Sequence, residues 1–378
     1  MIGDIYPLIL GILILVSSLI SLKLGISVTI VEILLGIITG NIGIIRPEAW
    51  MLYIASFGGI LLTFLSGIEI DSNLMKEKMK EIVLIGFLSF AAPFVIIFLF
   101  VYFIVGWNFL AAILCATALS ETSIAIVYSA LVEKNLLEYQ IGKILIGATF
   151  ITNLCTAIAL SILFIKPNLY TLLFYIISII VLFLAFKYSH ILFNSPILKN
   201  KLNEVEIKYI FLLLLILIFF ASLGQGQAIL PAFILGLLLS KHFKLNSPGY
   251  ETKKRLKIVA FAFITPIFFI VGGMKVSLSL IMSGIVIFVL IFVLRQLSKF
   301  LGVYFISKKY LNSNKQYITL MMSTGLTFGL IATTFGLTTG ILDQMTYSIL
   351  TGVLVLSAIL PTITAEKWFP PHTEDITD

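Results

Sequence analysis

An acidic side chain lies in the middle of a long apolar stretch, where a charged group is costly and therefore indicates a functional role. This residue is Glu121, near the centre of the apolar run from about 109 to 132. An ionised carboxylate is unfavourable in hydrocarbon, so we expect Glu121 to hold either a proton or a bound cation. The alternative is a neutral carboxyl that donates a structural hydrogen bond. The hydroxyl side chains around it are Thr117, Ser120, Thr122 and Ser123.

Further oxygen-bearing side chains lie at the centre of the next apolar run, from about 141 to 165. Carboxylate, hydroxyl and amide oxygens are the ligands of hard cations. We therefore expect Glu121 and Asn153 to bind a monovalent metal cation. The alternative for the neutral groups is a role in helix packing. The neutral oxygens of the predicted ion and proton site come from Thr122, Ser123, Thr152 and Asn153, with Thr149 one turn away.

A second polar tract occupies the corresponding place late in the chain, about 203 positions after the first. Both tracts are poor continuous helix, so we expect each to break a helix and to present free N–H or C=O groups to a bound ion. The alternative is an intact helix whose Ser and Thr side chains bond back to its own carbonyls. The residues at the two breaks are Ser120 in the first tract and Ser323, Thr324 and Gly325 in the second.

Two cations lie within the apolar run from about 279 to 306. Arg295 and Lys299 are four residues apart and therefore share one face of the predicted helix. Buried positive charges need partners, and we expect these two to compensate the carbonyl ends of the broken helices. For Lys299 the alternative is that its chain extends to the membrane surface. Arg295 lies too far from the helix end for that.

Besides Glu121, one acidic residue lies well inside an apolar run, and two more close a run. Glu32, in the run from about 27 to 45, is a secondary candidate for ion binding, although a structural role is favoured. Glu69 and Asp71 close the third apolar run just before a basic loop. We expect these two to be solvated or paired with Lys76.

The elements that position these side chains are membrane helices. Of 378 residues, 60% are apolar and 11% are charged, whereas about a quarter of a soluble domain is charged. At about 20 residues per span, the sequence predicts an all-α polytopic membrane protein with thirteen transmembrane helices. Residues 1–368 would form a single membrane transport domain, and 369–378 a short cytoplasmic tail. The predicted spans are 5–23, 27–45, 50–70, 82–106, 109–132, 141–165, 169–193, 207–224, 226–241, 258–276, 279–306, 316–340 and 345–368.

The basic residues predict the orientation of these spans. Loops after odd-numbered spans hold 20 of the 25 Lys and Arg residues, and loops after even-numbered spans hold 3. Because basic residues accumulate in cytoplasmic loops, we expect the N-terminus outside and the C-terminus in the cytoplasm. The net charge of +7 then reports topology and not a nucleic-acid partner. The sequence shows no phosphate loop, nucleophile elbow or metal-ligand spacing, so we expect no enzyme activity and no cofactor.

Two pairs of matched stretches predict an internal repeat. Residues 31–40 resemble 231–240, and residues 64–71 resemble 270–277. The paired stretches are an odd number of spans apart, so the second copy runs through the bilayer in the opposite direction. Spans two to six and nine to thirteen would form these inverted repeats, with the two discontinuous helices crossing between them. Such an architecture predicts alternating access, with a binding site near the bilayer midplane.

Several motifs resemble the cation:proton antiporter superfamily, and most closely its bacterial and archaeal sodium/proton and Kef-type branch. They are Val-Glu-Ile-Leu-Leu-Gly at 31–36, Phe-Leu-Ser-Gly-Ile-Glu-Ile-Asp at 64–71, Leu-Ser-Glu-Thr-Ser-Ile-Ala at 119–125 and Gly-Leu-Thr-Phe-Gly at 325–329. The resemblance implies a homodimer with a dimerisation domain and a mobile core domain that contains two crossed, broken helices. It also implies exchange of Na+ or K+ for protons.

The chain departs from this family at one functional position. In the family, the sixth span carries an Asp-Asp or Asn-Asp pair whose second aspartate binds the cation, and here Thr152 and Asn153 occupy those positions. The family lysine that often pairs with the first aspartate corresponds to Lys299. Either the carboxylate has moved to Glu121, which we favour, or Lys299 titrates instead, or proton coupling is lost. A further reading is that Asn153 was engineered in place of an aspartate.

The function expected from the sequence is secondary active antiport of Na+ or K+ against protons in the plasma membrane, with a role in pH homeostasis. A homodimer in membrane lipid is expected. One alternative is an uncoupled facilitator, or a transporter of anions or organic solutes that binds them with Arg295 and Lys299. Another is a transport-dead sensor, which the residue at Asn153 suggests.

Overall fold

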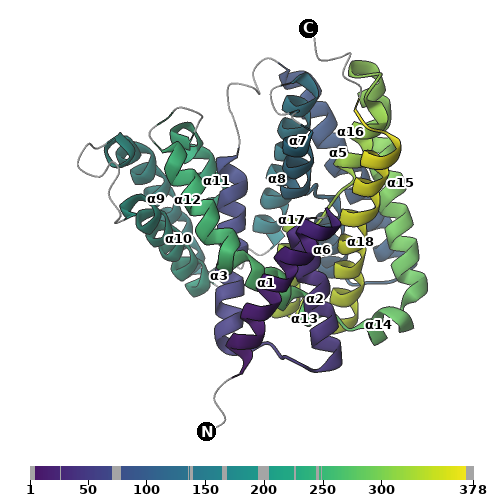
Figure 1. The fold of residues 1–378 in the computed structure, drawn as a ribbon, viewed down its shortest axis with the longest axis horizontal. Helices are drawn as coiled ribbons and strands as arrows, with labels where there is room; N and C mark the ends of the chain where they lie inside the picture. Colours follow the sequence, from purple (N-terminus) through teal and green to yellow (C-terminus); the bar gives the residue numbers. More distant parts are fainter. Residues whose placement is uncertain are drawn as a thin grey trace. The chain divides into compact units, whose positions relative to one another are not determined.

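The computed structural model describes residues 5–25, 27–69, 78–134, 136, 139–163, 168–194, 204–224, 227–243, 247 and 249–371. Within these ranges all regular structure is helical, which confirms the predicted all-α class (Figure 1). Asp71 and Lys76 lie outside the described residues, as does most of the predicted tail at 369–378.

Eleven helices in the described ranges are long and apolar enough to cross a membrane. Two shorter apolar helices, Val28–Ile42 and Ile229–Phe243, coincide with the predicted spans 27–45 and 226–241. The first is short because Gly43, with a left-handed φ of 79°, ends it. By length alone these two do not qualify as spans, so the count of thirteen remains a prediction.

The chain forms two compact units, which are described separately. The first unit comprises residues 1–52, 73–156 and 269–378. In it, α15 packs along α5, and α17 packs against α6 and α18. Its helices are α1 (Tyr6–Leu24), α2 (Val28–Ile42), α5 (Met79–Leu99), α6 (Phe109–Ser120), α7 (Ile124–Glu133), most of α8 (Gln140–Leu163), the end of α13 (Thr265–Met274), α14 (Leu278–Ser283), α15 (Ile285–Tyr310), α16 (Lys315–Met322), α17 (Thr327–Thr338) and α18 (Gln344–Trp368).

The second unit comprises residues 53–72 and 157–268. It contains most of α3 (Ala49–Ile68), α9 (Leu169–Asn194), α10 (Val205–Leu223), α11 (Ile229–Leu239) and α12 (Tyr250–Val259). The span predicted at 258–276 begins earlier than expected, because the basic residues from Tyr250 onward are helical. A first-turn Glu251, paired with Lys254 three residues later at 3.1 Å, suits that helix start.

The matched stretches of the sequence meet at two close helix crossings. In the first unit, a Cβ added to Gly36 of α2 would lie 3.1 Å from the Cα of Gly273 in α13, and the converse distance is also 3.1 Å. In the second unit, a Cβ added to Gly67 of α3 would lie 3.0 Å from the Cα of Gly236 in α11, and a Cβ added to Gly236 would lie 3.0 Å from the Cα of Gly67. Any side chain at these positions would force the backbones apart. Each crossing therefore joins one stretch from each copy of the repeat.

Both predicted helix breaks are present. α6 ends at Ser120 and α7 begins at Ile124, while α16 ends at Met322 and α17 begins at Thr327. The backbone of Glu121 is extended, with φ −67° and ψ 163°. Ser123 N–H donates to the Thr324 carbonyl at 3.3 Å, so the two extended segments lie against each other.

Candidate functional site

Lys299 of α15 neutralises the carbonyl end of the first broken helix. Its Nζ donates to Ser120 O at 2.7 Å, Ser89 Oγ at 3.0 Å and Thr122 Oγ1 at 3.0 Å. The side chain is fully buried, with 0% exposure. A lysine with three buried acceptors does not extend to the membrane surface, so that alternative is wrong. A positive charge at a helix C-terminus also opposes the helix dipole.

Arg295 lies one turn earlier on α15 and joins the two breaks. Its Nη1 donates to Ser323 O at 2.7 Å and its Nη2 to Glu121 O at 3.4 Å, so one guanidinium serves both extended segments. Gly325 provides the space, because a Cβ there would overlap Nη2. The planar, five-donor guanidinium suits such a bridge better than a lysine would.

The carboxyl group of Glu121 is buried without a partner. Its exposure is 0%, and neither of its oxygens has a hydrogen bond. Arg295 bonds the backbone carbonyl of this residue and not its side chain. The backbone N–H groups of Leu326 and Gly329, around the start of α17, lie near the carboxyl without forming a bond. The carboxylate thus sits in a positive field with its oxygens free.

The neighbouring hydroxyl groups are already engaged. Thr122 Oγ1 donates to Met322 O at 2.9 Å and accepts from Lys299, while Ser123 Oγ lies 3.2 Å from Thr327 Oγ1. These bonds hold the two extended segments together. Ser120 and Ser323 bond back to carbonyls of their own helices, at 2.6 and 2.7 Å, immediately before each helix breaks.

α8 reaches the same crossing through Thr149, whose hydroxyl lies 3.7 Å from the sulfur of Met322. Asn153 follows one turn later on that helix face. It is 1% exposed, and both its amide oxygen and its amide nitrogen lack hydrogen bonds. Thr152 Oγ1 donates to Thr149 O at 2.7 Å, which leaves its lone pairs available. Of the predicted oxygen ligands, Glu121 and Asn153 therefore keep free polar atoms.

Two features of this site were absent from the sequence prediction. Ser89 of α5 is a buried acceptor for Lys299, and the carbonyl of Met322 receives the Thr122 hydroxyl. Ser89 is the single hydroxyl side chain of α5, and only the packing of α5 along α15 indicates its role. A backbone carbonyl carries no sequence signal at all.

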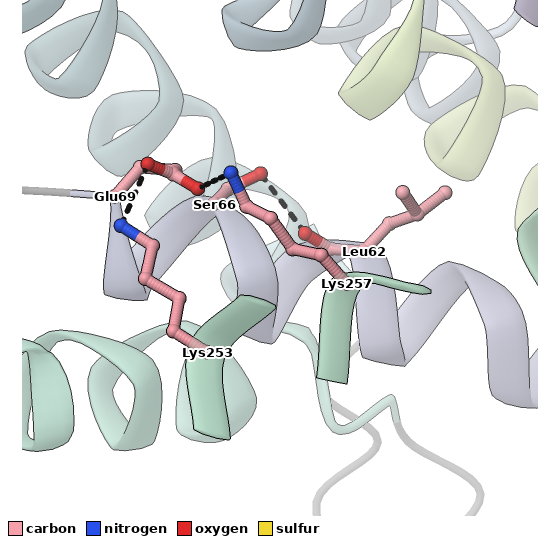
Figure 2. A network of polar contacts seen from close by, with 5 residues as sticks. All are labelled: Leu62, Ser66, Glu69, Lys253 and Lys257. Atoms are coloured by element: carbon pink, nitrogen blue, oxygen red, sulfur yellow. Dashed lines mark hydrogen bonds and ion pairs between the residues drawn. The ribbon is translucent and has the colours of Figure 1, made fainter. Parts of the chain in front are cut away.

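Glu69, at the end of α3 in the second unit, has different partners from those expected. Figure 2 shows its carboxylate between two lysines of α12: Lys253 Nζ lies 3.0 Å from Oε2, and Lys257 pairs with Oε1. The Glu69 side chain is only 10% exposed, so the prediction of a solvated residue is wrong, while the predicted partner Lys76 lies outside the described residues. Burial raises the pKa of Glu69, but the two lysines outweigh it and hold the pKa below its ordinary value.

Comparisons with known proteins point to one family. The profile described as "Sodium/hydrogen exchanger, transmembrane" matches residues 10–369. A relative named "Probable Na(+)/H(+) antiporter 3", from Methanocaldococcus jannaschii, is 28% identical, with 95% of this chain and 94% of the relative covered. "Putative Na(+)/H(+) antiporter YjbQ" of Bacillus subtilis is 26% identical over 90% of this chain, which spans 58% of that relative's length.

A solved structure shares the fold. The sodium proton antiporter MjNhaP1 from Methanocaldococcus jannaschii superposes with a TM-score of 0.69 at 17% sequence identity, covering 95% of this chain and 96% of that one. At this identity the likeness concerns the fold. With the profile match over nearly the whole length, the chain belongs to the sodium/hydrogen exchanger family of multi-pass membrane proteins.

Proposed function

We propose that the chain exchanges Na+ for protons by alternating access, and that Glu121 carries the two ions in turn. The observation that carries this proposal is a fully buried carboxyl with two unpartnered oxygens at the crossing of two broken helices. A proton and a Na+ ion are the two small cations that would satisfy such a group. The names of the relatives favour Na+ over K+.

Arg295 and Lys299 stabilise the state in which Glu121 is ionised and has no bound ion. When Glu121 has released both ions, its negative charge lies near two buried cations that are themselves held by backbone carbonyls. When Glu121 is protonated or binds Na+, those carbonyls still stabilise the cations as hydrogen-bond acceptors. Neither ion has to displace an ion pair in order to bind, so exchange between them is easy.

Asn153 and Thr152 supply neutral oxygens to the cation. Asn153 has a free amide oxygen, and Thr152 keeps lone pairs on its hydroxyl. Among the described residues no group of three His, Cys, Asp or Glu side chains gathers, so the site we propose has one carboxylate and neutral ligands. One carboxylate exchanges about one Na+ for one proton, which predicts electroneutral transport.

The predicted topology completes the proposal. Within the first unit, the ends of α1 and α18 line the same cavity, so the two helices run in the same direction. The start of α1 and the end of α18 therefore lie at opposite ends of this unit, as an outside N-terminus and a cytoplasmic C-terminus require. We place the protein in the plasma membrane as a homodimer, as its resemblance to the family implies.

Transport of an anion is the weaker candidate. It would need Arg295 and Lys299 to offer donors to a solute. Three donor groups of these side chains are instead committed to the carbonyls of Ser120, Glu121 and Ser323.

The test is exchange in proteoliposomes with an imposed Na+ gradient, followed by lumenal pH. We expect Glu121→Gln to abolish proton movement and Glu121→Asp to retain part of it. Glu69→Gln is the matched control, since it neutralises a buried glutamate that the proposal does not use, and it should exchange at the wild-type rate. Undiminished proton flux in Glu121→Gln would overturn the assignment.

A further inference from the structure

In the first unit, α2 holds one side of the turn that follows α13. Asn41, near the end of α2, donates from its Nδ2 to Val276 O at 2.8 Å, and its Oδ1 accepts from Leu278 N–H at 3.0 Å. The secondary ion candidate Glu32 is buried in the same helix, with 2% exposure, but lies more than two turns before Asn41. The bonds of Asn41 therefore join the turn to the end of α2.

α18 holds the other side of this turn. Ser348 Oγ accepts from Ser277 N–H at 2.9 Å, and the side-chain amide of Gln344 donates to the Lys275 carbonyl. Ser348 is buried with 0% exposure, whereas Gln344 is exposed. By the predicted topology this is the outer end of the unit, because the turn follows the tenth predicted span and α18 begins after the twelfth.

Tyr347 of α18 binds the last turn of α13. Its hydroxyl is fully buried and donates to Gly272 O at 2.6 Å. That carbonyl is available because the N–H of Val276, which would bond to it in a continued helix, bonds to Gly273 O at 2.9 Å instead. Gly273 is the glycine at which α13 crosses α2. We use the term outer clamp for the three α18 side chains that bind α13 and its turn, which are Gln344, Tyr347 and Ser348.

At its other end, α18 is separated from α2 by a cavity. The cavity has a volume of about 250 Å³ and lies between the end of α1, the start of α2, α7 and the end of α18. Val28 lines it from α2, and Thr362 lines it from α18. α18 is thus bonded to α13 and its turn at one end and held away from α2 at the other. A carrier with alternating access has this arrangement when it is open to one side only.

The Tyr347 hydroxyl also has neighbours that can accept its hydrogen bond. Thr334 of α17 and Thr351 of α18 lie next to it, and both of their hydroxyl oxygens are buried without a hydrogen bond. Thr351 stands one turn after Tyr347 on the same face of α18. A buried donor that loses its acceptor costs free energy. With these threonines beside it, Tyr347 can release Gly272 O and still keep a bonded hydroxyl.

We infer that the outer clamp determines which side of the exchanger is open, and that the Tyr347 hydroxyl switches between Gly272 O and the two threonines. The inference rests on the proposed function, because it takes alternating access as given. While the clamp is closed, the outer end is sealed and the inner cavity is open. When the clamp opens, α18 leaves α13 at the outer end and closes on α2 at the inner end. The clamp bonds stabilise the first conformation, and the threonine bonds stabilise the second.

The primary test measures the two conformations without transport. Spin labels are attached to Lys23→Cys at the end of α1 and Lys367→Cys at the end of α18, in a background with Cys115 and Cys155 replaced by alanine. Both lysines are exposed, and α1 packs along α2. Labelled protein is diluted with unlabelled protein, so that only distances within one chain are measured by pulsed electron paramagnetic resonance. We expect a longer and a shorter distance, for the open and the closed inner end.

Weakening the clamp should favour the shorter distance. We expect Ser348→Ala to shift the ratio of the two populations about threefold or more toward it, since a buried N–H loses its acceptor only in the clamped state. Gln344→Ala changes an exposed side chain and should shift the ratio in the same direction. Ser357→Ala is the matched control, because this buried serine bonds only to Val353 O of its own helix, at 2.6 Å. An unchanged ratio in Ser348→Ala, or an equal shift in Ser357→Ala, would overturn the inference.

Removing the alternative acceptors should have the opposite effect. Thr334→Val combined with Thr351→Val should reverse the shift caused by Ser348→Ala, because the released Tyr347 hydroxyl then finds no partner. In a Tyr347→Phe background the two valines should change nothing, since no hydroxyl is left to bind the threonines. A shift by the valines toward the shorter distance, or the same effect with and without the hydroxyl, contradicts the switch.

The second test uses exchange in proteoliposomes. A carrier shifted toward the outer side binds outer Na+ more readily and inner Na+ less readily, so Ser348→Ala should lower the KM for Na+ on the outer side and raise it on the inner side, each about twofold. A parallel change of KM on both sides would show general damage and would contradict the clamp. If the wild-type protein exchanges nothing, the proposed function fails, and the distance measurement still decides whether the clamp sets the conformation.

Discussion

Two clusters of this protein have the same composition, one glutamate and two cations, and opposite arrangements. In the second unit, Lys253 and Lys257 bind the carboxylate of Glu69 directly (Figure 2). In the first unit, Arg295 and Lys299 bind backbone carbonyls and leave the carboxylate of Glu121 without a hydrogen bond. The Glu69 cluster holds α3 against α12, whereas the Glu121 cluster leaves its carboxyl group available to bind an ion.

The difference comes from the backbone. In the second unit, the lysines of α12 bind the carboxylate of Glu69, which follows the last residue of α3. At the ends of α6 and α16 the helices break, and their last carbonyls compete for the cations. The two clusters contain the same charges. What distinguishes the structural cluster from the candidate ion site is whether the Lys and Arg side chains bond the carboxylate or backbone carbonyls.

The largest expected effect is on the free energy of unfolding, when one lysine of each cluster is replaced by methionine. Lys299→Met removes the donor for Ser120 O, Ser89 and Thr122 in a fully buried place, and we expect a loss of about 3–5 kcal/mol. Lys253→Met leaves Lys257 on Glu69 and should cost about 1 kcal/mol. Thermal unfolding in detergent measures both. Equal losses would remove the distinction between the clusters.

A smaller effect is expected from filling the space beside Arg295. Gly325→Ala would push the guanidinium off Ser323 and Glu121, with a loss of about 1–3 kcal/mol and a roughly tenfold slower exchange. Gly11→Ala in α1 is the matched control, because a Cβ there meets nothing within 4 Å. That variant should be neutral or slightly more stable. Full activity in Gly325→Ala would show that Arg295 does not hold the crossing.

The smallest effect is the pH dependence of the Glu69 cluster. The pKa of Glu69 lies below its ordinary value, so its ionised form stabilises the fold above about pH 4.5 and the contribution is lost as pH falls through the lowered pKa. Glu69→Gln should therefore unfold about 1–2 kcal/mol more easily at pH 7, and this gap should close in acid. Denaturation at a series of pH values measures it. A gap that widens toward low pH would contradict the ion pairing.

The sequence predicted the parts of the site that depend on local pattern. Ser and Thr clusters at corresponding positions located both helix breaks, and the depth of Arg295 and Lys299 indicated that they would face the carbonyl ends. Other features depend on which helices pack together. Glu69 pairs with a lysine 184 positions away, and Thr122 is occupied by a carbonyl 200 positions away. No local pattern encodes such partners.

The central claim is that one carboxyl exchanges a proton for Na+, and proton release on Na+ binding tests it most directly. Calorimetric titration with Na+, in buffers of different ionisation enthalpy near neutral pH, counts the protons released. We expect about one proton per Na+ bound for the wild-type protein and none for Glu121→Gln. The same release from Glu121→Gln as from the wild type would contradict the account, because another group would then carry the proton.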